Sequence, residues 1–190
     1  CAACRATCRF VPDADNREQH RRLGSPFLLS TAGAYVFEGA LREAIHKLKY
    51  NRSQRMAVPL GDMLHDYLAR HPIAVDAIVP VPLHPDRLRM RGYNQAALLA
   101  HRLAQRSGLM LCSDQLARVR RTSQQADLNR VERRENVRDA FGWQSKTPPP
   151  RRILLLDDVL TTGATVEAAA QALHAAGARE VHALALARGL

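Results

Sequence analysis

Two adjacent carboxylates followed by a hydroxyl-rich turn stand out in the stretch ILLLDDVLTTGATV, residues 153–166. The apolar run predicts a buried strand, and ligands bind at the carboxyl ends of such strands, where Asp157 and Asp158 stand. Backbone N–H groups that converge at a helix N-terminus bind phosphate, and a carboxylate accepts hydrogen bonds from sugar hydroxyls. The pattern therefore predicts a site for a ribose 5-phosphate. Its turn residues are Thr161, Thr162, Gly163, Ala164 and Thr165.

An acidic turn that only caps a helix is the simplest alternative. It explains Asp and Thr residues, but it does not explain two carboxylates beside a Thr-Thr-Gly-Ala-Thr turn. The chain contains neither the G-x-x-x-x-G-K pattern of ATP-binding loops nor the G-x-G-x-x-G pattern of dinucleotide-binding folds. ATPase and dehydrogenase functions are therefore disfavoured.

Strand and helix patterns alternate from Val75 onward, which predicts an α/β fold whose mostly parallel sheet is covered by helices on both faces. Residues 9–26 are polar and carry a run of charges, so we expect an exposed connection with little structure of its own. Residues 120–138 are polar, basic and too long for an ordinary connection, which predicts a mobile lid. The expected strands are 31–37, 77–81, 116–119, 140–143, 153–156 and 181–187, and the expected helices are 40–48, 56–68, 94–106 and 166–176.

Three of the four cysteines, Cys1, Cys4 and Cys8, crowd the beginning of the sequence. Cys1 and Cys4 form a C-x-x-C pair that could hold zinc, but a closed structural site needs four ligands. His20, or residues upstream of this sequence, could supply the fourth. The alternative, reduced thiols in a leader without metal, stays open.

Composition limits the class of protein and of partner. A chain of 190 residues with 46% apolar composition can bury one core, which favours a single main domain. The formal charge of +10 favours polyanions or phosphorylated small molecules as partners. No run approaches the roughly 20 apolar residues of a membrane span, and the start resembles no signal or transit peptide. We expect a soluble, cytoplasmic protein.

Residues 153–166 resemble the 5-phosphoribosyl 1-pyrophosphate (PRPP) signature of type I phosphoribosyltransferases. Three more blocks narrow the resemblance to the ComF family: LKY at 48–50, PVPLHPDRLRMRGYNQA at 80–96, and RVRRTSQQADLNRVERRENVRDAF at 118–141. The resemblance implies that residues 27–190 form one domain, a Rossmann-like core with a small N-terminal hood. It also implies a Mg²⁺-dependent PRPP site and a link to natural competence. Members usually open with a zinc ribbon of paired C-x-x-C motifs, and residues 1–26 carry only what resembles the second pair.

The resemblance also implies roles for individual residues. Asp157 and Asp158 match the acidic pair that holds the ribose hydroxyls, and 161–165 matches the loop that holds the 5-phosphate. Segment 118–138 matches a flexible loop, in which Arg120 and Arg133 would join the acidic pair in catalysis. The residues expected to meet the pyrophosphate are Val81, Pro82, Leu83, Arg87, Arg91 and Asn94.

Two functions remain open from the sequence. The first is transfer of the phosphoribosyl group of Mg-PRPP to a nitrogen nucleophile, with release of pyrophosphate. The second is a non-catalytic component of the DNA-uptake machinery that binds PRPP or single-stranded DNA, and a competence helicase would then be a possible partner. Phe and Tyr are few and scattered, so the sequence reveals no stacking platform for bases. No residue set identifies the acceptor.

Overall fold

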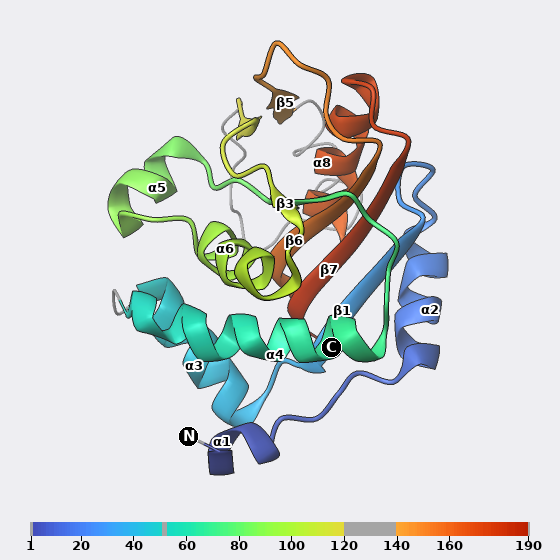
Figure 1. Ribbon diagram of the computed structural model, residues 1–190. Helices are drawn as coiled ribbons and strands as arrows, with labels where there is room; N and C mark the ends of the chain where they lie inside the picture. Colours follow the sequence, from blue (N-terminus) through green and yellow to red (C-terminus); the bar gives the residue numbers. More distant parts are fainter. Residues whose placement is uncertain (1, 51–52, 120–139, 190) are drawn as a thin grey trace.

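The computed structural model describes residues 2–50, 53–119 and 140–189, which alternate between helices and strands along most of the chain (Figure 1). In chain order the elements are α1 (Ala2–Ala6), α2 (Asp13–Leu23), β1 (Ser30–Val36), α3 (Gly39–Tyr50), the 3₁₀ helix η1 (Gln54–Met56), α4 (Ala57–Arg70), β2 (Ala77–Pro80), α5 (Pro85–Arg91), α6 (Gln95–Ser107), β3 (Met110–Leu111), β4 (Leu116–Arg118), β5 (Phe141–Trp143), β6 (Arg152–Leu160), α8 (Ala164–Ala175) and β7 (Glu180–Arg188).

The main sheet has five parallel strands in the order β1-β7-β6-β2-β3. Its central strands β6 and β7 are almost continuously apolar and buried, as expected of a parallel sheet covered on both faces. The predicted α/β class and the mostly parallel sheet are thus confirmed.

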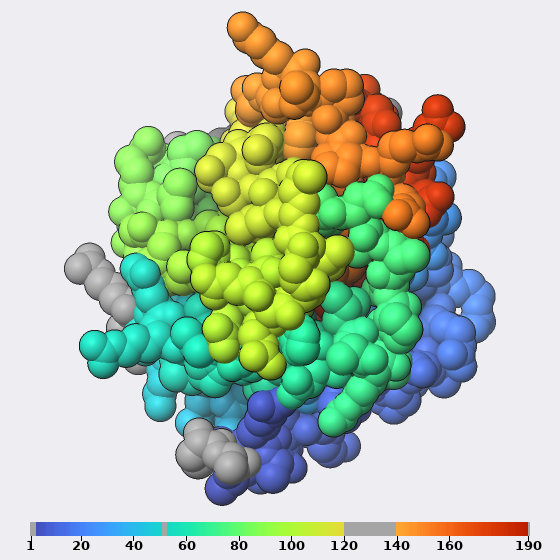
Figure 2. Space-filling view, viewed as in Figure 1, coloured from blue at the N-terminus to red at the C-terminus, as the bar shows by residue number. Residues whose placement is uncertain are grey.

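Successive side chains of β6 enter two different cores, because residues alternate between the faces of a strand. Leu154 and Leu156 pack with the apolar faces of α3, α4 and α6. Ile153 and Leu155 pack with α8 and with Leu23 of α2. Viewed from the first of these faces, α4 and α6 lie in front of the sheet (Figure 1 and Figure 2). None of the described helices has the length and apolar character that a membrane span requires.

Strands β4 and β5 form a separate antiparallel pair, with Arg118 opposite Phe141. Both strands were predicted at nearly these positions, but their pairing with each other was not. The predicted lid at 120–138 follows β4 in the sequence and lies outside the described residues.

The prediction that residues 9–26 form an exposed connection with little structure was wrong for α2. This helix starts with Asp13 and Asp15 and ends with basic residues, which suits the helix dipole. It packs on β1 through the buried Asn16, whose side-chain amide donates to the Gly33 carbonyl at 3.2 Å and accepts from the Gly33 N–H at 3.0 Å. These contacts depend on residues elsewhere in the chain, so local polarity could not reveal them. The short helix α5 was also missed.

Candidate functional site

The turn after β6 forms the centre of the candidate site. Strand β6 runs to Leu160, past both aspartates and further than predicted, and α8 starts at Ala164. Gly163 has φ 83°, a left-handed conformation that residues with a Cβ rarely adopt, and it stands at the N-cap of α8. Thr161 is exposed, and Thr162 and Thr165 are half-buried. The turn therefore presents hydroxyls at the N-terminus of a twelve-residue helix.

Two residues of helix α2 contact this turn. The Gln19 side-chain amide donates a hydrogen bond to the Thr161 carbonyl at 2.7 Å. A Cβ added to Gly163 would lie 3.1 Å from each of the terminal methyl carbons of Leu23, a tighter approach than ordinary van der Waals contact. Neither Gln19 nor Leu23 was predicted from the sequence to support the turn. The acidic start and basic end of the 13–23 segment were the only signals for a helix there.

The two aspartates have different surroundings. Asp157 is half-buried, and its Oδ1 accepts a hydrogen bond of 2.8 Å from the backbone N–H of Asp158. Burial, followed by the neighbouring Asp158 carboxylate, raises the pKa of Asp157 well above its ordinary value, and Lys49 offsets part of this effect. Asp157 is therefore the member of the pair that a ligand can approach and whose charge is costly to hold.

Asp158 is buried and bonded within the protein. Its Oδ2 forms an ion pair with Lys49 Nζ of α3, and its Oδ1 accepts a hydrogen bond of 3.1 Å from the Gln95 amide of α6. Both carboxylate oxygens thus have protein partners, which is the usual condition for a buried charge.

Arg118 lies within electrostatic reach of Asp157 and of a second guanidinium group, that of Arg87. The Arg118 guanidinium carbon lies 5.4 Å from the centroid of the Phe141 ring. Burial and the neighbouring Arg87 lower the pKa of Arg118, while Asp157 acts in the opposite direction. Arg118 is therefore repelled by Arg87 and attracted by Asp157. An anion with several phosphate oxygens would relieve that repulsion.

Comparison with known proteins agrees with this geometry. Residues 88–190, more than half of the chain, match the family model described as the phosphoribosyl transferase domain. DNA utilization protein YhgH of Escherichia coli strain K12 is 34% identical over 155 residues, which cover 79% of this chain and 68% of that protein. The chain belongs to the ComF family.

Two other relatives carry competence names. Competence protein F of Haemophilus influenzae is 39% identical over 115 residues, covering 60% of this chain and 50% of the relative. Competence protein ComFC of Streptococcus pneumoniae is 28% identical over 160 residues, covering 84% of this chain and 69% of the relative. The chain thus spans half to about two thirds of the length of these curated ComF-family relatives.

Several residues that the ComF resemblance assigned to the pyrophosphate are bonded inside the protein. The Asn94 side chain caps α6 by accepting from the Ala96 N–H at 3.0 Å, and it donates to the Val81 carbonyl at 3.0 Å. Arg91 donates to the Gln95 side-chain carbonyl, and its guanidinium lies 5.3 Å from the Tyr50 ring centroid. Val81 is buried, whereas Pro82, Leu83 and Arg87 are half-buried.

The remaining predicted catalytic residues are two arginines of the predicted lid. Arg120 and Arg133 lie outside the described residues, as does most of the segment assigned to the ComF flexible loop. Their catalytic role stays a prediction.

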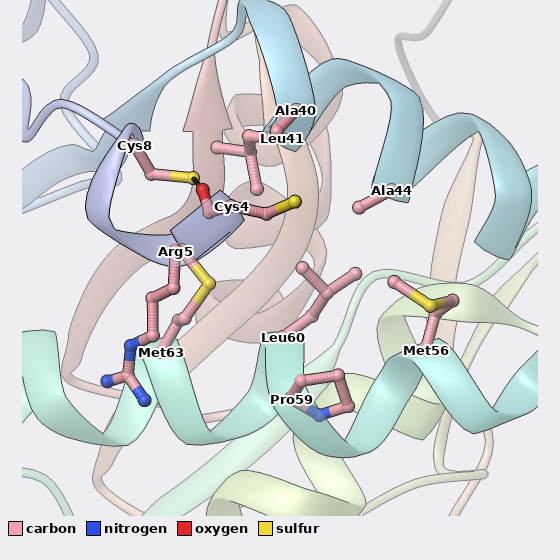
Figure 3. A pocket seen from close by; sticks show the side chains of 10 residues that line it. All are labelled: Cys4, Arg5, Cys8, Ala40, Leu41, Ala44, Met56, Pro59, Leu60 and Met63. Atoms are coloured by element: carbon pink, nitrogen blue, oxygen red, sulfur yellow. Dashed lines mark hydrogen bonds between the residues drawn. The ribbon is translucent and has the colours of Figure 1, made fainter. Parts of the chain in front are cut away.

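The cavity that Cys4 and Cys8 line includes neither aspartate. Cys4 and Cys8 line an apolar cavity of about 380 Å³ between α1, α3 and α4, and the Cys8 thiol donates to the Cys4 carbonyl at 3.3 Å (Figure 3). His20 is on α2, within electrostatic reach of His182 in β7, rather than beside this cavity. Across residues 2–50, 53–119 and 140–189, no group of three His, Cys, Asp or Glu side chains could hold a metal. Cys1 lies outside these ranges, so zinc binding stays a prediction.

Proposed function

We propose that this ComF-family chain binds Mg-PRPP at the turn after β6 and transfers its phosphoribosyl group to a nitrogen nucleophile. One observation carries the proposal: the half-buried carboxylate of Asp157 lies shortly before the turn at the N-terminus of α8 and within electrostatic reach of Arg118, which Arg87 repels. In this arrangement the 5-phosphate would meet 161–165, the ribose hydroxyls would meet Asp157, and the pyrophosphate would meet Arg87 and Arg118.

The reaction needs positioning and charge more than a base. The nucleophile's nitrogen lone pair forms a bond to C1 of the ribose as the C1–oxygen bond breaks. The pyrophosphate leaves with that electron pair, and the proton released by the nitrogen passes to solvent. Asp157 would stabilise the positive charge that develops on the ribose, and Arg87 with Arg118 would stabilise the leaving group. The predicted lid residues Arg120 and Arg133 would add positive charge to the same leaving group.

The described residues fit magnesium only as part of its PRPP complex. Asp158 is already paired with Lys49, and Asp157 supplies a single nearby charge. Mg²⁺ keeps several waters and is readily held by substrate phosphates, so PRPP oxygens and water would be its ligands. Bound in this way, the ion would neutralise charge on the pyrophosphate.

Thermal unfolding with and without Mg-PRPP tests binding. A ligand that binds only the folded state stabilises it by about 2.7 kcal/mol at one hundred times its dissociation constant. We expect Mg-PRPP and ribose 5-phosphate to raise the melting temperature, and ribose to leave it unchanged. An unchanged melting temperature at millimolar Mg-PRPP would refute the proposal. Pyrophosphate release in a screen of amines, ammonia and nucleobases would then identify the acceptor.

A second candidate is a binding role in DNA uptake, in keeping with the names of the relatives. Among the described residues, Tyr50 has the most exposed aromatic side chain. Tyr50 is 66% exposed, with the His46 ring centroid 5.4 Å from its own. It borders a groove of about 550 Å³ on α3 that also contains Arg42 and Lys47. Single-stranded DNA should then bind with an affinity that falls steeply as salt rises, and no binding at low salt would remove this candidate.

A further inference from the structure

Lys49 contributes a largely buried cation to the candidate site. Its side chain is 20% exposed and that of its partner Asp158 is 5% exposed, so solvent screens their ion pair little. The sequence pattern of α3 explains why this lysine points inward. Leu41, Ile45 and Leu48 are buried on one stripe of the helix, and Lys49 follows Ile45 by four residues on that stripe. Lys47, two positions earlier, is exposed.

The ion pair belongs to a closed series of contacts that joins four elements. Asp158 of β6 also accepts from Gln95 of α6, whose side-chain carbonyl accepts from Arg91 of α5. Arg91 in turn lies over the ring of Tyr50, the residue after Lys49 on α3. Each polar group in the series thus already has a partner within the protein, and Asp158 is fixed from two sides.

We propose that Lys49 is a positioning residue of the ribose site, whose ion pair holds Asp158 so that Asp157 alone offers its carboxylate to the ribose. This inference rests on the proposed function and refines it. Asp158 connects β6 to α3 and α6, while Asp157 remains half-buried beside the turn. The backbone N–H of Asp158 donates to Asp157 Oδ1, so any shift of Asp158 also moves the group that orients Asp157. Lys49 would therefore act on the ligand through two aspartates without touching it.

Titration of ribose 5-phosphate by calorimetry, without magnesium or pyrophosphate, tests the inference. Lys49→Met keeps much of the side-chain length and removes the charge, so Asp158 loses its partner. We expect ribose 5-phosphate to bind about tenfold more weakly, the effect of one lost charged hydrogen bond. Lys47→Met removes an exposed charge from the same helix and should change affinity by less than about twofold. Lys49→Arg should restore most of the affinity, because a guanidinium can also pair with Asp158.

A double-mutant cycle separates positioning from general damage. In the Asp158→Asn background, Lys49→Met should weaken binding by less than about twofold, because the partner charge is already gone. If Lys49→Met alone does not fold because Asp158 is left unpaired, the double variant lacks that unpaired charge, and its affinity can still be compared with that of Asp158→Asn. Equal losses from Lys49→Met in both backgrounds, or unchanged affinity in Lys49→Met, would overturn the inference and leave the proposed function standing. A wild-type chain that binds no ribose 5-phosphate would overturn both.

Discussion

The turn at 161–165 and the segment at 81–94 both match ComF motifs, yet they use their polar groups differently. The turn has partly exposed threonine hydroxyls and the N-terminus of α8, and its support comes from α2. In the segment, the Asn94 and Arg91 side chains bond to neighbouring parts of the protein. Arg87 is the exception, because its charge acts on Arg118 beside Asp157. Motif membership therefore does not distinguish residues that bind a ligand from residues that hold the binding loop in place.

The largest expected effect is at Gly163, where the turn has no room for a side chain. Gly163→Ala would add a Cβ in a left-handed conformation, at a cost of about 1–2 kcal/mol, and would press it against Leu23. We expect a lower melting temperature and a loss of ribose 5-phosphate affinity of about tenfold or more, since a shift of the turn misdirects several N–H donors.

Gly108→Ala is the matched control for this substitution. Gly108 also has a positive φ, 73°, but an added Cβ would meet no atom within 4 Å, and the residue caps the far end of α6. It should lower the melting temperature without changing ribose 5-phosphate affinity. Equal losses of affinity in both variants would mean that the turn has no special role.

Asp157→Asn should separate stability from binding. Because the folded-state pKa of Asp157 is raised, the folded protein binds this proton more tightly than the unfolded chain does. Wild-type stability therefore declines as pH rises from about 4 through the folded-state pKa, and the cost persists above it. The neutral asparagine lacks this cost.

We thus expect Asp157→Asn to melt at a higher temperature than wild type at pH 8 and at the same temperature near pH 3. It should also bind ribose 5-phosphate about tenfold more weakly, having lost a charged acceptor. Melting curves across this pH range, with calorimetry at pH 8, measure both effects. A lower melting temperature at pH 8 would contradict the assignment of Asp157 as the costly, ligand-facing carboxylate.

Features that depend on neighbouring residues in the sequence could be predicted, whereas features that depend on distant contacts could not. The strand–turn–helix at 153–166 was predictable because its signals are local: an apolar run, a glycine and a helical pattern follow one another directly. The alternation that gives the parallel sheet is local in the same sense. Neither required knowledge of distant contacts.

The different surroundings of the two aspartates were not predictable, because they depend on contacts between distant residues. Gln95 meets Asp158 across a separation of 63 residues, and Gln19 meets Thr161 across 142. A polar segment such as 13–23 resembles an exposed connection until its partners are known. For an Asn or Gln side chain in particular, the sequence does not indicate whether its amide group binds a ligand or another part of the protein.

Asn94→Ala should reduce stability more than ligand binding. Loss of an N-cap costs about 1 kcal/mol, or roughly 2–4 °C in melting temperature for a chain of this size, and the bond to the Val81 carbonyl is lost as well. Mg-PRPP affinity should change by less than about threefold. Arg87→Ala is the contrast within the same segment, and it should weaken Mg-PRPP binding by about tenfold while leaving ribose 5-phosphate binding unchanged. The opposite pattern would make Asn94 the pyrophosphate contact.

The smallest expected effect is at Gln19, whose single hydrogen bond joins α2 to the turn. Gln19→Ala removes the donor to the Thr161 carbonyl, an exposed bond worth about 0.5–1.5 kcal/mol, so ribose 5-phosphate should bind only about threefold more weakly. Gln19→Glu keeps the side-chain length but replaces the donor with a carboxylate, which would repel both the carbonyl and a bound phosphate, so its loss should be larger. Calorimetry on both variants, with Glu18→Ala as the control on the same helix, measures the series. If Gln19→Glu bound as tightly as wild type, helix α2 would have no part in orienting the turn, and its packing there would be purely structural.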